Sequence, residues 1–356
     1  MKKILLILFM LLIPFALPAD TSRIPPGDGV AAADEDGESF NVADVIFEHV
    51  GDSYEWHFFT TKAGKSVAIY LPVIVKAGDG WHCFSSRKLL HGGPGTEYQG
   101  LHIAAAGEPH EGKIVQADGT RPLDLSITKN VLSLIMGSLL LVVLVLLTSG
   151  WYRRHDSLKE APKGLAAAME ILIVPIDEMA RDNIGEADYR KYSPYLCTVF
   201  LFILLNNFLG IIPFFPGGAN LTGNIACTLV LALFTFFTVN LTGTRHYYKE
   251  MFLPDVPGPL KPLMAVIEVF SAMVKPISLT IRLFANMLAG HIQILCMVCI
   301  IFIVAKYGGA LLGGMGLISV VFGVFLDVLE MLISYIQAYI FTMLSSIYIG
   351  LAREKE

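Results

Sequence analysis

Long apolar runs separated by short polar segments dominate the chain after residue 128. Residues 131–148 carry no charge, and residues 194–212 and 224–241 form two further uncharged runs of similar length. Each run approaches the roughly 20 residues that an α-helix needs to cross the hydrocarbon core of a bilayer. We therefore expect an all-α polytopic membrane domain over residues 129–356.

Two apolar segments near the C-terminus are too long for a simple crossing. They cover residues 263–305 and 317–351, and as helices they would measure roughly 50–65 Å, about twice the bilayer core. Each must tilt strongly, bend, as Pro276 would permit, or split into two spans. A glycine-rich turn at residues 308–316 is expected to join them. The pattern predicts about five membrane helices, the last two forming a long tilted hairpin.

The N-terminal part of the chain has a different pattern. Lys2 and Lys3 precede a short apolar run that ends near Ala19, which is typical of a secretory signal peptide over residues 1–19. The alternative is an uncleaved membrane anchor. With either a signal peptide or an anchor, residues 20–128 should lie on the external side of the membrane. Within that region, alternating β-branched and aromatic residues at 54–60 and 66–75 predict a small external (periplasmic) β-rich domain.

Basic residues fix the expected orientation. Trp151, Arg153 and Arg154 follow the first span directly, and aromatic and basic residues at a helix end are typical of the cytoplasmic interface. The amphipathic segment 164–180 is expected to lie along that face. We expect a multi-pass protein of a bacterial inner membrane, with its N-terminal domain outside and its C-terminus in the cytoplasm.

Composition and charge narrow the class further. Of the residues, 54% are apolar and 16% charged, and the mean hydropathy is +0.61, which excludes a purely soluble enzyme because soluble chains carry roughly 25% charged residues. Residues 20–128 hold 16 Asp/Glu and 8 Lys/Arg, so an acidic head precedes a mildly basic membrane domain. Lys and Arg do not cluster as in nucleic-acid binders. The head's six histidines lack ligand spacing, so we expect no metal.

Ionisable residues inside an apolar run suggest chemistry. Glu268, Lys275 and Arg282 follow one another at seven-residue intervals, which places them on one stripe of a helix. Each would cost about 2.5–3.5 kcal/mol at the bilayer centre. A single buried Arg could simply neutralise a carboxylate, so this stripe alone leaves a structural role open.

Further polar residues extend the pattern. Asn286 and Gln293 continue the stripe beyond Arg282, whereas His291 lies about half a turn away. The last apolar segment has its own polar face at three- and four-residue spacing, formed by Asp327, Glu330, Ser334 and Gln337. In a helical hairpin Glu330 could contact His291, and both can bind and release protons. Arg282 would stay charged. The cluster as a whole favours an ion or proton pathway.

Four stretches of sequence carry a family resemblance: SLTIRLFANMLAGH (278–291), NNFLGIIPFF (206–215), EVFSAMVKPISL (268–279) and LEMLISYIQAYIFTMLSSIYIG (329–350). They resemble the a subunit of F-type ATP synthases. The resemblance covers about residues 129–356, and the Arg–Asn–His spacing with the downstream Gln is its most specific part. Ala285 stands where many members of the family have Gly. The resemblance does not extend to residues 20–128.

The resemblance implies a mechanism. In this family two long tilted helices curve around a ring of c subunits, each with one membrane-buried carboxylate. Arg282 would be the essential arginine, which makes the passing carboxylate release its proton and blocks a leak between two offset half-channels. Asn286 and Gln337 would be its polar neighbours.

The resemblance also implies a place for the other polar residues. His291 and Glu330 would be a half-channel pair whose acidic and histidine positions are exchanged relative to some bacterial members. Glu268 would belong to the cytoplasmic side of the path. Asp327 and Lys275 could each line water or form a structural ion pair.

The expected function is therefore proton translocation by a non-catalytic subunit. The chain lacks the G-x-x-x-x-G-K-[ST] string of a phosphate-binding loop, so we expect no nucleotide or other cofactor. The implied partners are the c-ring proteolipid subunits, peripheral-stalk b subunits, membrane lipid and, indirectly, the catalytic head. Two alternatives stay open. A self-contained ion or proton secondary transporter would usually show internal repeats, and a metalloenzyme using His291 and Glu330 would need a third ligand.

Overall fold

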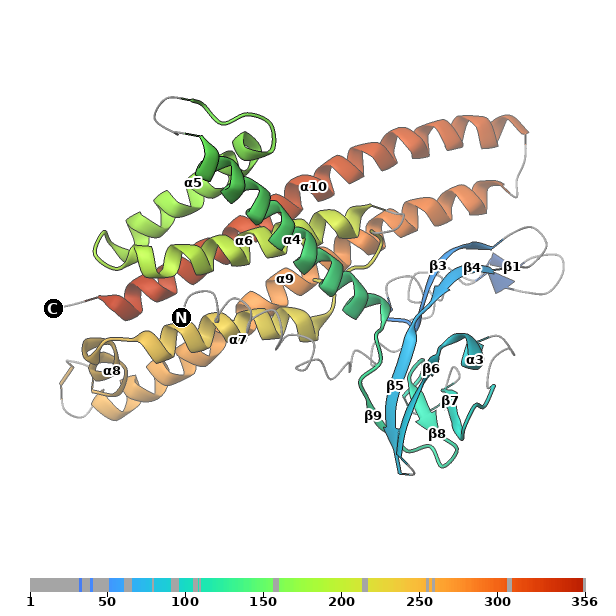
Figure 1. Cartoon of the computed structure of the whole chain (residues 1–356), viewed down its shortest axis with the longest axis horizontal. Helices are drawn as coiled ribbons and strands as arrows, with labels where there is room; N and C mark the ends of the chain where they lie inside the picture. The colour runs from blue at the N-terminus through green and yellow to red at the C-terminus, as the bar shows by residue number, and fades with distance from the viewer. Residues whose placement is uncertain are drawn as a thin grey trace.

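A computed structural model gives the fold. It describes residues 32–33, 39–40, 51–60, 66–78, 80–90, 96–104, 108, 110–155, 160–212, 217–253, 256–257, 260–305 and 309–354. The expected signal peptide at 1–19 lies outside these residues. The described part consists of a helical domain and a smaller β-rich head at one end of it (Figure 1).

The helical domain confirms the expected fold class. Its helices are α4 (Lys129–Arg154), α5 (Leu165–Ile184), α6 (Tyr189–Ile211), α7 (Ile225–Thr242), α8 (Arg245–Phe252), α9 (Lys261–Ala305) and α10 (Gly309–Arg353). Five of them are long and apolar enough to cross a membrane: α4, α6, α7 and most of α9 and α10. α6 begins five residues before the predicted start at residue 194. Near that start, the Ser193 hydroxyl donates a hydrogen bond to Asp177 of α5.

The last two helices form the long hairpin. Each is continuous over 45 residues, and the two run side by side along the long axis of the molecule (Figure 1). Pro276 does not divide α9, although it removes a backbone donor. The Thr280 hydroxyl, one turn later, donates to the Pro276 carbonyl at 2.9 Å.

The predicted glycine-rich turn is wrong. α10 begins at Gly309, so Gly313, Gly314 and Gly316 are helical. A glycine costs a helix only about 1 kcal/mol relative to alanine, and the intervening residues include Ala310, Leu311 and Leu312, which are good helix formers. In an apolar environment, backbone groups left outside a helix would cost more than that.

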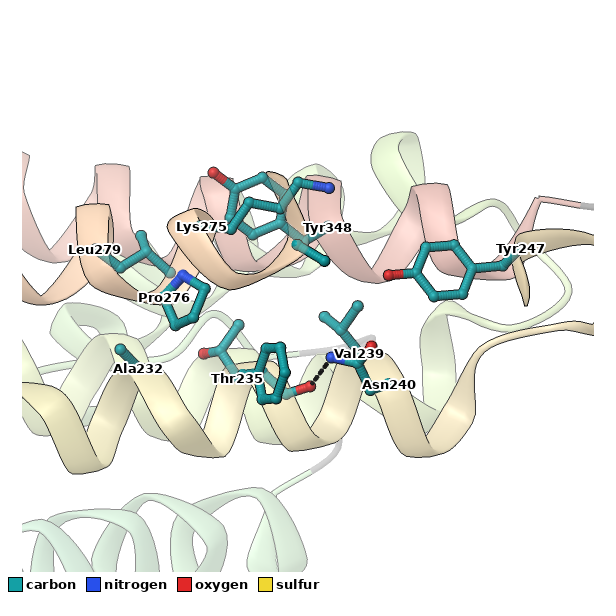
Figure 2. Close-up of a pocket in the computed structure, with 11 residues that line it drawn as sticks. Ala232, Thr235, Val239, Asn240, Tyr247, Lys275, Pro276, Leu279 and Tyr348 are labelled. Atoms are coloured by element: carbon teal, nitrogen blue, oxygen red, sulfur yellow. Dashed lines mark hydrogen bonds between the residues drawn. The ribbon is translucent and has the colours of Figure 1, made fainter. Parts of the chain in front are cut away.

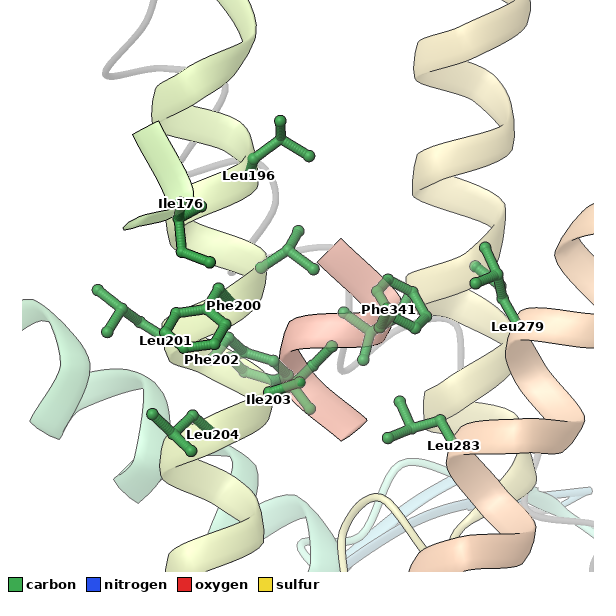
Figure 3. Close-up of a cluster of buried hydrophobic side chains, with 14 of the residues drawn as sticks. Ile176, Leu196, Phe200, Leu201, Phe202, Ile203, Leu204, Leu279, Leu283 and Phe341 are labelled. Carbon is green, nitrogen blue, oxygen red and sulfur yellow. The ribbon is translucent and has the colours of Figure 1, made fainter. Parts of the chain in front are cut away.

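The core of the helical domain is centred on α6. Phe200, Phe202 and Ile203 are almost fully buried there, and they pack with Phe341 of α10 and Leu283 of α9 (Figure 3). Of the apolar part of α6, 61% is buried within the chain, against 17% for α9. α6 is thus an interior helix, and α9 leaves most of its surface uncovered.

The C-terminal end of α10 is fastened to its neighbours. One guanidinium nitrogen of Arg353 lies 2.7 Å from an Asp188 carboxylate oxygen, and the other donates to the Thr242 carbonyl at 3.1 Å. The Thr244 amide also donates to the Ala352 carbonyl at 2.9 Å. This C-terminal clasp joins α10 to the start of α6 and to the junction of α7 and α8.

Close packing of α5 against α10 leads to a first prediction. A Cβ atom at Gly350 would lie 2.1 Å from the backbone carbonyl oxygen of Asn183, whereas one at Gly150 would meet nothing within 4 Å. Gly350→Ala should therefore force the helices apart and destabilise the domain by about 1–3 kcal/mol. Thermal denaturation of the purified complex would measure this. Gly150→Ala is the matched control, and equal melting of the two variants would contradict the packing argument.

The head is β-rich, as expected. A three-stranded antiparallel sheet has the order β6-β5-β9, and the predicted 66–75 strand is divided into β4 and β5 at Leu71. Its core contains Tyr54, Val73, Val75 and Phe84 among others. The elements are β1 (Ala32–Ala33), β2 (Ser39–Phe40), β3 (Glu55–Thr60), β4 (Ser66–Tyr70), β5 (Pro72–Ala77), β6 (Gly80–Ser85), α3 (Arg87–Leu90), β7 (Leu101–Ile103), β8 (Ile114–Gln116) and β9 (Leu123–Asp124).

The head is joined directly to the start of α4. The Asn130 amide donates to the Asp52 carboxylate at 3.1 Å, and the Lys129 amide donates to the Ser53 carbonyl at 2.9 Å. The Thr128 side chain caps the helix by accepting from the Val131 amide. Burial raises the pKa of Asp52. These bonds satisfy the free amides of the first helical turn and fix the head to the membrane helix.

Candidate functional site

A buried histidine and glutamate meet between α9 and α10. His291 Nδ1 lies 2.9 Å from Glu330 Oε1, with the side chains 15% and 5% exposed. His291 Nε2 lies 3.3 Å from the Gly210 carbonyl oxygen of α6. Because a carbonyl only accepts, Nε2 would be the donor in this second contact. The contact between His291 and Glu330 that the sequence predicted is present.

The pair fits because Gly290 leaves room for it. A Cβ atom at Gly290 would lie 2.9 Å from Glu330 Oε1, too close for the carboxylate to keep its place, whereas one at Gly210 would be in ordinary contact with His291 at 3.5 Å. Among the described residues, Glu330 Oε2 is buried without a hydrogen-bond partner.

Gly290 therefore gives a second prediction. Gly290→Ala should displace the Glu330 carboxylate and slow proton transport several-fold while the helix itself, which favours Ala over Gly, stays intact. Gly323→Ala in α10 is the matched control because a Cβ atom there meets nothing within 4 Å. Transport by both variants would be measured in vesicles. Unchanged transport in Gly290→Ala would contradict the importance of this spacing.

A polar network lies about one helical turn from the pair, on its α6 side. The Thr222 hydroxyl donates to Asn207 Oδ1 at 2.7 Å, and Asn207 Nδ2 donates to the Ser334 carbonyl at 3.4 Å. Asn220 Nδ2 donates to the Met287 carbonyl at 3.3 Å. The segment between α6 and α7 thereby folds back onto α6 and α9, and Asn207 joins α6 to α10. The motif that contains Asn207 indicated this residue in the sequence, but no sequence pattern indicated Asn220 or Thr222, which stand in the turn between α6 and α7.

The arginine stripe is separate from the His291–Glu330 pair. Asn286 Nδ2 donates to Gln337 Oε1 at 2.7 Å, and Gln337 is buried. Arg282 is half-buried one turn away. Among the described residues, neither Glu330 nor any other carboxylate forms an ion pair with Arg282.

Three other expected site residues do not join either group. Glu268, Gln293 and Asp327 are all exposed at the surface of the hairpin. Large apolar side chains of α9 are exposed alongside them, including Phe270 and Ile281. Arg282 therefore lies within a broad apolar surface of α9 that nothing in the described chain covers.

Lys275 has a different environment from Arg282. Its ammonium lies 5.2 Å from the centre of the Tyr348 ring, a distance typical of a cation–π contact. Beside it, α7, α9 and α10 enclose a cavity of about 20 Å³ (Figure 2), which is enough for about one water. Tyr247 lines the other end of the cavity. The pKa of its phenol is raised, mainly because burial disfavours the charged form and also because Tyr248 and Glu268 can carry negative charge nearby. Among the described residues, the ammonium of Lys275 contacts the Tyr348 ring and forms no ion pair.

Comparison with known proteins decides the family. The family model described as "ATP synthase A chain" matches residues 134–350. The chain belongs to the ATP synthase subunit a family. A second model, a domain of unknown function (DUF8433), matches residues 45–131, which cover most of the described head and the start of α4.

Named relatives agree with the family model. The ATP synthase subunit a of Pelodictyon phaeoclathratiforme is 43% identical over 256 residues, covering 70% of this chain and 71% of the relative. ATP synthase subunit a 2 of Prosthecochloris aestuarii is 42% identical over 65% of this chain and 70% of its own length. The subunit a of Myxococcus xanthus is 38% identical over 65% and 74%.

Membership of this family has direct consequences. The chain is a multi-pass membrane protein and a proton-translocating subunit of an F-type ATP synthase complex. The resemblance of the sequence to the a subunit of F-type ATP synthases is confirmed. The chain is therefore assigned to this family rather than to the secondary transporters or metalloenzymes considered as alternatives. Among the described residues, no three potential ligands gather into a metal site.

Proposed function

We propose that this subunit provides two offset half-channels for protons and holds Arg282 against the c-ring. The observation that carries the proposal is the division of α9 into two polar regions. The buried His291–Glu330 pair faces the interior beside α6. Arg282 and Asn286 lie on the surface of the hairpin with uncovered apolar side chains around them.

The proposed route begins outside the membrane. Protons pass Asp327 and Gln293, reach the His291–Glu330 pair, and are handed to a ring carboxylate. On the other side of Arg282, a ring carboxylate gives up its proton as it meets the guanidinium, which cannot release a proton itself. That proton leaves past Glu268 towards the cytoplasm. Asn286 and Gln337 hold the polar surface next to Arg282 in place.

We also propose which subunits contact this chain and how its segments are placed relative to the membrane. The c-ring would cover the exposed apolar face of α9 that includes Phe270 and Ile281, because so much apolar surface beside a charge fits a protein partner inside the membrane better than lipid. Peripheral-stalk b subunits and, indirectly, the catalytic head complete the complex, and chemistry on ATP takes place there. We place a cleaved signal peptide at 1–19, an external domain at 20–128 and the proton-channel domain at 129–356, in a bacterial inner membrane.

The sidedness of two exposed carboxylates tests the half-channels. Glu268→Cys should react with a membrane-impermeant thiol reagent only from the cytoplasmic side, and Asp327→Cys only from the external side. Labelling of the whole complex in inverted and right-side-out vesicles, followed by mass spectrometry of the peptide, would measure this. The unsubstituted chain, which contains Cys296 and Cys299 in the same hairpin, is the control. Reaction of both positions from the same side would contradict two offset channels.

A further inference from the structure

The three-stranded sheet of the head leaves one face open. Opposite residues of an antiparallel pair point to the same face, and the register pairs Lys76 with both Trp81 and Leu123. These three residues form a row across β6, β5 and β9. Trp81 is 59% exposed and Leu123 is 58% exposed. The opposite face, with Val73 and Val75, packs into the core of the head.

The same face continues beside this row. Ile74 pairs with Cys83 in the next outward position, and the Leu125 amide bonds to the Ile74 carbonyl. Leu125 is itself 40% exposed. We call the residues Ile74, Lys76, Trp81, Cys83, Leu123 and Leu125 the outer sheet face. It is an aromatic and aliphatic surface that the described chain does not cover.

The charge of this face differs from that of the head around it. Residues 20–128 contain twice as many acidic as basic residues. At the described outward positions of β5, β6 and β9, however, Lys76 is the charged residue and none is Asp or Glu. Arg121, two positions before Leu123 in the same extended segment, is also exposed. The face is therefore cationic and apolar on an otherwise acidic domain, which complements a negatively charged partner.

Its position relative to the membrane suggests which partner. Leu125 precedes Lys129, the first residue of α4, by four residues, and an extended chain covers at most about 3.6 Å per residue. The edge of the face thus lies within about 14 Å of the start of a membrane-spanning helix, and β9 leads into that helix (Figure 1). Trp, Lys and Arg beside aliphatic residues are characteristic of the membrane–water interface.

We propose that the outer sheet face rests on the phospholipid headgroups around α4. Trp81 and Leu123 insert at headgroup level, and Lys76 lies among the phosphates. The bonds of Asp52 and Ser53 to the start of α4 hold the head at the height that this requires. The surface lies in the region that a domain of unknown function matches, and the proposal gives that region a membrane-contacting role.

Cys83 allows a direct test, since it is exposed on this face. A spin label attached there from the aqueous phase, in the complete complex in bilayers containing phosphatidylglycerol, would report its surroundings. We expect ready collision with dissolved oxygen and at least several-fold fewer collisions with a water-soluble nickel chelate than at a control site. The control is Glu97→Cys in a Cys83→Ser chain, because Glu97 is exposed next to Tyr98, which packs on the other side of the sheet.

Other surroundings of the outer sheet face would give different results. Equal access of the nickel chelate at both sites would overturn the proposal. Low access of both oxygen and nickel at Cys83 would also overturn it, by indicating a protein partner or a second copy. Replacing Trp81 and Leu123 together with Ser removes no core contact and should restore nickel access at Cys83. No change in that variant would count against these two side chains as the anchor.

Discussion

Replacing Arg282 with Ala is expected to reduce ATP-driven proton pumping to background while the complex still assembles. The guanidinium is half-buried without a carboxylate partner in the described chain, so its removal leaves no uncompensated charge behind and should not unfold the hairpin. Without its charge, a ring carboxylate would no longer be driven to release its proton. Acidification of inverted vesicles and recovery of the intact complex are the two measurements.

Two further variants define what Arg282 contributes. Ile281→Ala shortens the neighbouring exposed side chain without changing charge, and it should keep most of the pumping activity. Arg282→Lys should lose most of it, because a lysine ammonium can release its proton near a carboxylate and lacks the fork of the guanidinium. Normal pumping by an assembled Arg282→Ala complex would refute the proposed role.

The second large effect is expected at Glu330. Glu330→Gln keeps the size of the side chain but removes the ionisable carboxylate, which lies 2.9 Å from His291 and which we propose to exchange a proton with it. Loss of one positioned proton-transfer group typically costs about 10²-fold or more in rate. We expect proton transport to fall by about that factor, with assembly much less affected. Proton flux through vesicles stripped of the catalytic head would measure it.

A Glu→Gln substitution at the protein surface is the control for Glu330→Gln. Glu354→Gln alters an exposed residue just beyond the end of α10 and should leave the flux unchanged. Exchanging the pair, with His291→Glu and Glu330→His in one chain, retains both titratable groups and should recover part of the lost flux. If Glu330→Gln alone conducted protons normally, the half-channel would have to be assigned to other residues.

The membrane helices were predictable because hydrophobic length is a local property of the sequence. The runs at 131–148 and 224–241 lie within α4 and α7 almost as expected. The His291–Glu330 contact was also predictable, because two long helices joined in a hairpin must lie antiparallel and the polar faces can be aligned by counting. The roles of these side chains in transport remain predictions.

Other features depend on tertiary packing and could not be predicted from the pattern. The glycines after residue 308 looked like a turn, yet α10 begins at Gly309. The need for Gly290 arises only from the distance to a carboxylate 40 positions later. Asn220 and Thr222 become part of the site because their loop folds back onto α9 and α6, which no local sequence signal indicates.

The clasp at Arg353 has a mechanical consequence. A stator is loaded sideways whenever a rotor moves past it, and a helix of 45 residues would bend under that load if it were held only by lipid. The bonds of Arg353 to Asp188 and Thr242 add a fixed point at the C-terminal end of α10, beyond the packing of its middle against α6. Gln337 lies closer to this fixed point than Glu330 does, so the same load should displace Gln337 less.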